Sequence, residues 1–436
     1  MEQIKIEKLD ITIYHQKLNN GLSVYLVPKD KENNIYATLT TKYGSNDIEF
    51  IPNGENDFYK SPNGVAHFLE HKLFEQKNGD DPFSFFAKSG CSNNAYTNFH
   101  NTTYLFSGMN EFEKNIEYLL DFVQEPYFTD ENVEKEKGII IEELKMYLDN
   151  PYRLGLEKIL SNSFSEIPIK IPTIGTVSSI KSITKEDLYT CYNTFYHPGN
   201  MILVIAGNID VEKTMNIIIS NQEKKEFPEF KEIKLKQYEE PLNVIKEKET
   251  INMNVTIPKL MLGYKINIKN LLKKYPKYIL FQYIGMYFEC KISSTAPLME
   301  QLKKDGIINT NIDFSIVYAN DFIECIIISD TMKPDILKEK INNYLIDKET
   351  MEEDFLRKKK NYLSSNIYMS DNIFGLNNKI INNIVLNGNI LTDIYGIYNR
   401  LQYNEFSDCI NSIDFSNQTT LIIKPLNACQ EEENKL

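Results

Sequence analysis

The 436-residue sequence contains no tryptophan and only five histidines. No stretch approaches the roughly 20 consecutive apolar residues that a membrane-spanning helix requires. The N-terminus alternates charged with single hydrophobic residues and lacks the apolar core of a secretory signal peptide. These absences predict a cytoplasmic protein that neither spans nor binds a membrane.

Cysteine and positive charge are also scarce. The six cysteines stand far apart, and no two of them form a CxxC pair. This spacing argues against a disulfide framework or a cysteine-rich zinc site. Forty-eight lysines and arginines face 61 aspartates and glutamates, which gives a formal net charge of -13. Such a balance argues against a basic face for nucleic acid and predicts no nucleic-acid partner.

One change in composition divides the chain into two parts of similar length. Residues 223–248 are charge-dense, contain Pro228 and Pro241, and show little apolar periodicity. We interpret them as a linker between an N-terminal domain, residues 1–222, and a C-terminal domain, residues 249–436. At 436 residues the chain is too long for one ordinary domain.

The order of predicted elements repeats loosely in the two parts. Alternating residues at 22–27 and 36–43 predict two strands that pair with each other. A helix follows at about 62–75, with Ser61 as its N-cap. Further predicted strands cover residues 92–98, 102–108 and 201–206, with helices at 110–124, 130–149, 153–162 and 184–195. The second part repeats strands, helices and a closing strand at 419–423. Each part is therefore expected to be an α+β unit, an antiparallel-rich sheet covered by helices.

The segment HFLEH, residues 67–71, carries the residue types of a catalytic zinc site. On a helix, positions i and i+4 share one face about 6 Å apart, so His67 and His71 can bind one cation. Glu70 can reach the outer side of the same metal. Two imidazoles and one carboxylate, with water in the fourth position, form a usual catalytic zinc set. The apolar residues around the two histidines predict a largely buried helix, in which inert histidines would be costly.

A third protein ligand is expected on the helix that begins near residue 130. Four glutamates are available there: Glu134, Glu136, Glu142 and Glu143. Spacing by itself does not choose among them. We take the buried stripe of this helix as Val133, Gly138, Ile141, Leu144 and Leu148. Glu134 lies beside that stripe, whereas Glu136 is expected on a solvated face, paired with lysine.

Several segments of the N-terminal half resemble the inverzincin metallopeptidases of the pitrilysin/insulinase type. They are HFLEH, VEKEKGIIIEE (residues 133–143), GCSNNAYTNFHNTTYLF (residues 90–106) and YHPGNMILVIAGNID (residues 196–210). The sequence around HFLEHKLFE is similar to that of a processing-peptidase-like bacterial branch, the YmfH-like proteins. The resemblance implies two similar halves that face each other as a clam shell.

The resemblance also implies roles for individual residues. His67, His71 and Glu134 would bind Zn2+, and Glu70 would be the general base that activates water for attack on a peptide carbonyl. The strand at 92–97 would receive an extended peptide substrate by strand addition. Its predicted substrate-binding residues are Asn93, Asn94, Ala95 and Tyr96; the alternative is an ordinary core strand. His100, on or beside the next strand, is a candidate for lining the cleft, and the alternative is a surface histidine.

The sequence departs from the family pattern in three places. Only 62 residues separate His71 from Glu134, fewer than usual, and Tyr127 stands where many members have a second glutamate. In the C-terminal half, Lys303 and Asn309 replace an arginine and a tyrosine that hold the substrate carbonyl. Lysine lacks arginine's planar fork, and asparagine lacks the phenol.

The last departure predicts a partner. In related two-subunit peptidases one chain carries the metal and the other carries the arginine–tyrosine pair. We therefore expect this chain to be the metal-bearing subunit of a heterodimer with a paralogous chain, or otherwise a homodimer. The alternative is a peptide-binding or scaffold component of a protein-modification pathway, with little or no hydrolysis.

Overall fold

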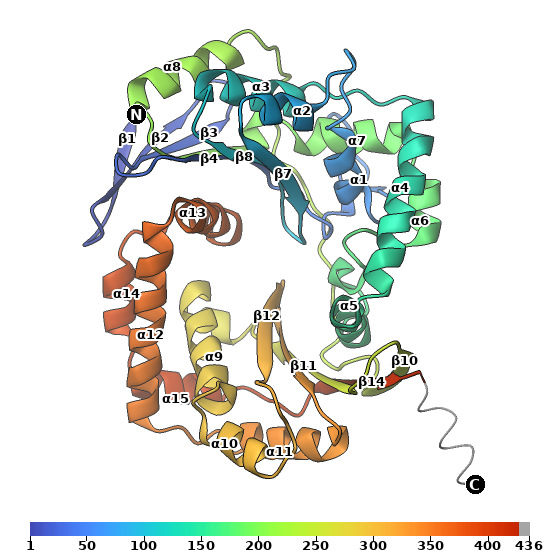
Figure 1. The fold of residues 1–436 in the computed structure, drawn as a ribbon, viewed down its shortest axis with the longest axis vertical. Coiled ribbons are helices and arrows are strands. Elements are labelled where there is room, and N and C mark those ends of the chain that lie inside the picture. The colour runs from blue at the N-terminus through green and yellow to red at the C-terminus, as the bar shows by residue number, and fades with distance from the viewer. Residues whose placement is uncertain (427–436) are drawn as a thin grey trace. The chain divides into compact units, whose positions relative to one another are not determined.

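The computed structural model describes residues 1–426, which form two compact units (Figure 1). Unit 1 contains residues 1–144, 172–237 and 365–395, and the described part of unit 2 contains residues 145–171, 238–364 and 396–426. The units therefore do not follow the two halves of the sequence, because each includes one segment from the other half. The domain boundaries derived from the sequence stay a prediction.

Unit 1 is built on a seven-stranded sheet. In spatial order its strands are β1 (Glu2–Ile6), β2 (Ile11–Lys17), β3 (Ser23–Pro28), β9 (Met201–Gly207), β4 (Ile35–Thr41), β8 (Thr102–Gly108) and β7 (Ser92–Thr97). Only β3 and β9 run parallel; the other neighbours are antiparallel. The predicted pairing of residues 22–27 with 36–43 is wrong, because β9 lies between β3 and β4.

Helices from the N-terminal half cover one face of this sheet (Figure 1). They include α2 (Pro82–Lys88), α3 (Phe112–Gln124) and α8 (Val211–Gln222), of which α3 and α8 pack on the central strands. The other helices of this part are α1 (Val65–Lys72), α4 (Asp130–Leu148), α6 (Val177–Ser182) and α7 (Lys185–Phe195). Helix α1 packs on β7, β8 and α7. A short hairpin, β5 (Glu49–Phe50) and β6 (Tyr59–Lys60), precedes α1. The strand β1 and the helices α2, α6 and α8 were not among the predicted elements.

Unit 2 repeats five adjacent strands of that sheet, those from β3 to the terminal strand β7. Its strand order is β10 (Lys248–Met253), β14 (Gln418–Pro425), β11 (Lys259–Asn267), β13 (Phe322–Asp330) and β12 (Asp313–Ala319). The first pair is parallel and the other three are antiparallel. This is the same sequence of pairing directions as β3-β9-β4-β8-β7 in unit 1. The predicted α+β class and the two similar halves are therefore confirmed.

Six helices of the C-terminal half complete unit 2 or connect it to the rest of the chain. They are α9 (Lys277–Ile292), α10 (Pro297–Lys304), α11 (Pro334–Ile346), α12 (Glu352–Asp371), α14 (Ile394–Arg400) and α15 (Tyr403–Asn411). The aromatic side chains of α9 enter the core, where Phe288 stacks on Phe314 of β12 with ring centroids 5.6 Å apart. Tyr287 and Phe288 are fully buried, as expected for a helix that is apolar on nearly every side.

Each unit uses one helix from the opposite half of the sequence. Helix α13 (Ile373–Asn387) packs on β4 and β9 in unit 1, on the face away from α3 and α8 (Figure 1). Its buried Asn377 accepts a hydrogen bond from the Thr38 hydroxyl at 2.7 Å and donates to the Val204 carbonyl at 2.9 Å. In unit 2, α5 (Pro151–Ser163) packs on β11 and β14, the strands that correspond to β4 and β9. The same exchange therefore occurs at the same place in both sheets.

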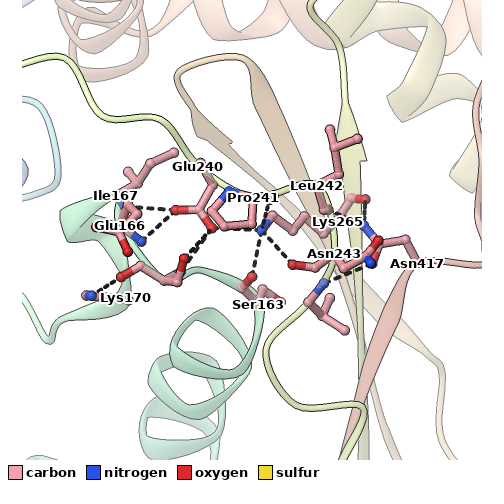
Figure 2. Close-up of polar contacts among 12 residues, drawn as sticks. Ser163, Glu166, Ile167, Lys170, Glu240, Pro241, Leu242, Asn243, Lys265 and Asn417 are labelled. Carbon is pink, nitrogen blue, oxygen red and sulfur yellow. Dashed lines mark hydrogen bonds and ion pairs between the residues drawn. The ribbon is translucent and has the colours of Figure 1, made fainter.

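The charged segment after α8 is held by specific contacts (Figure 2). The Glu240 carboxylate accepts hydrogen bonds from the backbone amides of Ser165, Glu166 and Ile167 at 2.8–2.9 Å. It also pairs with the fully buried Lys265 ammonium at 2.8 Å. Burial by itself would raise the pKa of Glu240, but these donors outweigh it and hold the pKa below its usual range. The segment is thus anchored to α5 and β11, although residues 224–247 include only one isolated bridge residue and no regular helix or strand.

Two further predictions concern the environment of the chain. Within residues 1–426, no helix combines the length and the apolar character needed to cross a membrane. The five cysteines in that range, Cys91, Cys191, Cys290, Cys325 and Cys409, are buried free thiols. Cys429 lies outside the described residues.

Candidate metal centre

Helix α1 carries both histidines and is positioned by its buried residues. It begins after Gly64, whose backbone is left-handed with a φ of 92°, and no side chain caps its N-terminus. A side chain there would lie 2.4 Å from the Ile174 carbonyl oxygen, so the close contact requires glycine. The predicted N-cap Ser61 instead donates to the Ile48 carbonyl. Phe68 and Leu69 are fully buried and fix the orientation of the helix. The direction of the neighbouring side chains, His67, Glu70 and His71, is therefore fixed as well.

The structure brings His67, His71 and Glu143 together. Their potential ligand atoms all lie within 4.8 Å of one another. The Glu143 Oε2 atom is 3.3 Å from His71 Nε2 and 3.8 Å from His67 Nε2. A tetrahedral zinc site with bonds of about 2.0–2.1 Å has ligand–ligand edges of roughly 3.3 Å. Two imidazole nitrogens and one carboxylate oxygen at these separations fit zinc in both chemistry and size.

A second glutamate of α4 contacts the other nitrogen of His71. Glu136 Oε1 lies 3.0 Å from His71 Nδ1, and the Glu136 side chain is only 13% exposed. An Nδ1–H bond to a carboxylate leaves Nε2 as the ring nitrogen that faces a metal. Burial lowers the pKa of the metal-free His71 imidazole, but Glu136 and Glu143 outweigh it and raise the pKa to about 9. Zinc binding would therefore displace a proton from this ring.

Glu134 is not part of the cluster. Its side chain is 69% exposed and pairs with Lys137 on the same helix. The structure therefore does not place the predicted third ligand, Glu134, at the candidate site and brings Glu143 there instead. The predicted solvated face for Glu136 is wrong. The cause is the assignment of the buried stripe, since Gly138 and Leu148 are exposed.

The helical period explains why Glu143 and Glu136 share a face. Val133, Ile140 and Leu144 are buried, and residues 136 and 143 lie about 60–80° to one side of them, whereas residue 134 lies about 100° to the other. Two glutamates seven residues apart were therefore the available sequence signal. Many family members are expected to have a second glutamate seven residues before the third ligand. Counted from Glu134 that position is Tyr127, whereas counted from Glu143 it is Glu136.

Glu70 lies beside the cluster without belonging to it. The Thr97 hydroxyl, at the end of β7, donates a hydrogen bond to Glu70 Oε2 at 2.5 Å. Burial raises the pKa of the Glu70 carboxyl, and the Thr97 hydrogen bond and the neighbouring His71 charge only partly offset that rise. A half-buried carboxyl with a raised pKa, next to a metal site, has the properties of a general base.

A lysine at the end of α1 connects the two ligand-bearing helices. Lys72 is fully buried, pairs with Glu75, and donates to the Asn132 carbonyl at the start of α4 at 3.3 Å. Its buried charge ties the C-terminal end of α1 to the first turn of α4. Sequence reasoning did not single out this residue.

The predicted substrate strand is the terminal strand of the unit 1 sheet. β7 pairs only with β8 among the strands of residues 1–426. The backbone amide of Ala95 donates to Asn94 Oδ1 at 2.9 Å, and the buried Asn93 Nδ2 has no hydrogen-bond partner in the described part of the chain. Tyr96 is half-buried on this strand. His100 is half-buried in the turn between β7 and β8, where its backbone amide donates to Asn98.

Lys303 and Asn309, which are predicted to stand in place of an arginine–tyrosine pair, are exposed in unit 2. Lys303 lies in the last turn of α10 and its ammonium donates to Asn311 Oδ1 at 2.8 Å. Asn309 lies in the loop that precedes β12.

Comparisons with known proteins agree with this fold and site. A model of the insulinase family, peptidase family M16, matches residues 54–177, and one of the peptidase M16 inactive domain matches residues 182–362. The uncharacterized zinc protease YmfH of Bacillus subtilis is 43% identical over 348 residues, which cover 79% of this chain and 80% of that one. The crystal structure of an M16-like peptidase from Alicyclobacillus acidocaldarius has a TM-score of 0.89 and 31% identity, over 96% of this chain and all of that one.

A more distant relative is the β subunit of the mitochondrial-processing peptidase of Caenorhabditis elegans. It is 28% identical over 165 residues, or 37% of this chain and 36% of that subunit.

The HxxEH helix, the His–His–Glu cluster and the repeated α+β units define the class of inverzincin-type metallopeptidases. The chain belongs to the insulinase family of peptidases, family M16, and the predicted YmfH-like resemblance is confirmed. Relatives in this family are named zinc proteases, and the donor set of His67, His71 and Glu143 fits that metal.

Proposed function

We propose that the chain is a zinc metalloendopeptidase that hydrolyses peptides or unfolded segments. The observation that carries the proposal is the placement of Glu70. This carboxylate lies beside a three-residue metal site, is oriented by Thr97, and is not itself one of the clustered ligands. A chain that used the metal only for stability would have no need of a second, half-buried carboxylate there.

The residues divide the work of hydrolysis among them. His67, His71 and Glu143 would hold the metal, and Glu136 would orient His71 through Nδ1. Zinc, when bound, polarises a water molecule and the substrate carbonyl. Glu70 takes a proton from the attacking water and gives it to the leaving amine, so one carboxyl serves first as base and then as acid.

Substrate would bind as an additional strand along β7. The edge offers backbone groups for strand addition, and the Ala95 amide donates to the adjacent Asn94 side chain. A substrate carbonyl could replace that local contact, and the Asn93 amide nitrogen is a further donor that lacks a partner among the described residues. Because strand addition needs an extended chain, folded proteins would be poor substrates.

We further propose that the active form is a heterodimer. Lys303 and Asn309 do not supply a guanidinium or a phenol for the developing oxyanion. A paralogous chain with the arginine–tyrosine pair would complete the site, and the similarity to a named subunit of a processing peptidase supports this arrangement. A homodimer is the remaining assembly. The buried free cysteines are consistent with a cytoplasmic location.

The test is zinc content together with cleavage of a mixed peptide library, by the chain alone and with a paralogous chain that lacks HxxEH. We expect about one zinc per chain and cleavage that requires the second chain. Glu70→Gln should keep its zinc and lose turnover by roughly a hundredfold to ten-thousandfold, the usual share of general acid–base catalysis. Cleavage by this variant at the wild-type rate would refute the role of Glu70.

Zinc binding without cleavage in any combination would favour the second candidate, a peptide-binding or scaffold component of a modification pathway. The free edge of β7 would then bind peptides without hydrolysing them.

A further inference from the structure

Thr97 connects the substrate edge to the carboxyl of Glu70. It is the last residue of β7, and its Oγ1 atom lies 2.5 Å from Glu70 Oε2. Its cross-strand neighbour on β8 is Thr102, whose Oγ1 is 3.3 Å away. The Thr102 hydroxyl in turn lies 3.0 Å from the carbonyl oxygen of Tyr43. Three polar contacts thus lead from a buried backbone carbonyl to the catalytic carboxyl.

The chemistry of these groups determines where each proton lies. A carbonyl oxygen only accepts, so the Thr102 hydroxyl proton is used for Tyr43. An ionised carboxylate also only accepts, so the Thr97 hydroxyl must donate to Glu70 Oε2. The Thr97 proton is therefore directed away from Thr102, and Oε2 is the carboxylate oxygen that is held.

We propose that Thr97 is a positioning residue that assigns the two oxygens of Glu70 to different tasks. This inference rests on the hydrolytic function proposed above. Thr97 holds Oε2, and Oε1 takes the proton from water while the water oxygen bonds to the substrate carbonyl carbon. The same proton then passes from Oε1 to the amine nitrogen as the peptide C–N bond breaks.

The Thr97 hydrogen bond can persist through the whole cycle. When Oε1 carries the proton, Oε2 remains an acceptor for the Thr97 hydroxyl. The carboxyl therefore does not need to rotate between its action as base and its action as acid. Since threonine has two heavy atoms on Cβ, its χ1 angle is restricted, and the hydroxyl is directed at small cost in entropy.

The position of Thr97 in the sheet adds a second consequence. A peptide that adds to β7 orders the same strand that carries the Thr97 hydroxyl. Substrate binding and orientation of the base are thus joined in one strand, which a serine or threonine on a separate loop would not achieve.

The test compares Thr97→Val with Thr97→Ser in the zinc-loaded protein, in the assembly that cleaves the library. Valine keeps the branched shape and removes the hydroxyl, while serine keeps the hydroxyl and removes the methyl group. Loss of a hydrogen bond to a charged group corresponds to a decrease in kcat of about tenfold to a hundredfold. We expect that decrease for Thr97→Val, with KM, zinc content and melting temperature close to the wild-type values, and near-complete rescue in Thr97→Ser.

Crystal structures of the wild type and Thr97→Val provide a measurement that does not depend on turnover. Glu70 should keep one rotamer against Thr97 in the wild type and adopt others in the variant. If the wild type cleaves no peptide, the proposed function fails, and the structures still decide the role of Thr97. An unchanged kcat in Thr97→Val, an equal loss in Thr97→Ser, a loss of zinc, or an unmoved Glu70 would each overturn the inference.

Discussion

Zinc affinity should distinguish three glutamates that stand on one helix. Glu143 lies 3.3–3.8 Å from the ring nitrogens of His71 and His67, Glu136 contacts the far side of His71, and Glu134 is exposed and paired with Lys137. Single replacements at these three positions therefore remove a direct ligand, an orienting contact and a surface ion pair. The sequence is otherwise unchanged, and Glu134→Ala is the matched control.

The expected magnitudes follow from these contacts. Glu136→Gln removes a charged partner of a metal-binding imidazole, and such outer contacts are worth about tenfold to a hundredfold in metal affinity. Glu143→Ala leaves only two histidines as protein ligands, so its loss should exceed a hundredfold. A surface ion pair contributes at most about 1 kcal/mol to stability and nothing to the site. Glu134→Ala should therefore bind zinc within about twofold of the wild type.

The assay is a competition titration of the metal-free proteins with zinc against a chromophoric chelator at fixed pH. Circular dichroism of each variant checks that the fold is retained. Loss of zinc in Glu134→Ala together with full binding in Glu143→Ala would refute the ligand assignment. A Glu136→Gln variant that binds zinc like the wild type would refute the orienting role of Glu136 alone.

Two further predictions concern unit 2. Burial, partly offset by Ser163 and Lys265, raises the pKa of the Glu324 carboxyl from 4.5 to about 8, so the folded protein keeps a proton that the unfolded chain releases. The contribution of this group to the free energy of unfolding is complete below about pH 4.5 and is lost as the pH rises towards 8. Between pH 5 and pH 8, the free energy of unfolding of Glu324→Gln should therefore rise by about 3–4 kcal/mol relative to that of the wild type. Chemical denaturation followed by circular dichroism measures this gain, and a pH-independent difference would contradict the raised pKa. Lys265→Met, which leaves Glu240 buried without its ammonium partner, should lower the free energy of unfolding by about 3–5 kcal/mol, whereas Lys269→Met, at an exposed ion pair, should change it by less than about 0.5 kcal/mol. Equal effects of the two methionine variants would show that the buried pair is not a major contributor.

The helix that carries HxxEH was predictable from the sequence because the pattern that defines it is local. A helical turn places His67 and His71 on one face whatever the rest of the fold does, and Glu70 follows from the same period. Most strands were predicted for a similar reason, since alternation and turn residues act over a few positions. The family resemblance of the N-terminal half was likewise contained in short segments.

The third ligand could not be chosen in this way, because it depends on which face of α4 packs against α1. In the sequence alone, Glu134 and Glu143 are equally plausible as metal ligands. Only the burial of Val133, Ile140 and Leu144 places Glu143 on the side of α4 that faces the histidines. A single error in the buried stripe moved the prediction to the wrong side of the helix.

The order of distant strands in each sheet, and the packing of one helix from each half on the sheet of the other, were also decided only by the tertiary structure. The insertion of β9 between β3 and β4 joins residues more than 150 positions apart. The packing of α13 on the first sheet and of α5 on the second depends on contacts such as Asn377 with Thr38, over a separation of 339 residues. The sequence determined the local chemistry of the HxxEH helix, because a helical turn needs no distant partner. The tertiary structure decided which residues meet at the candidate metal site and the order of the strands, because both depend on which distant surfaces bury one another.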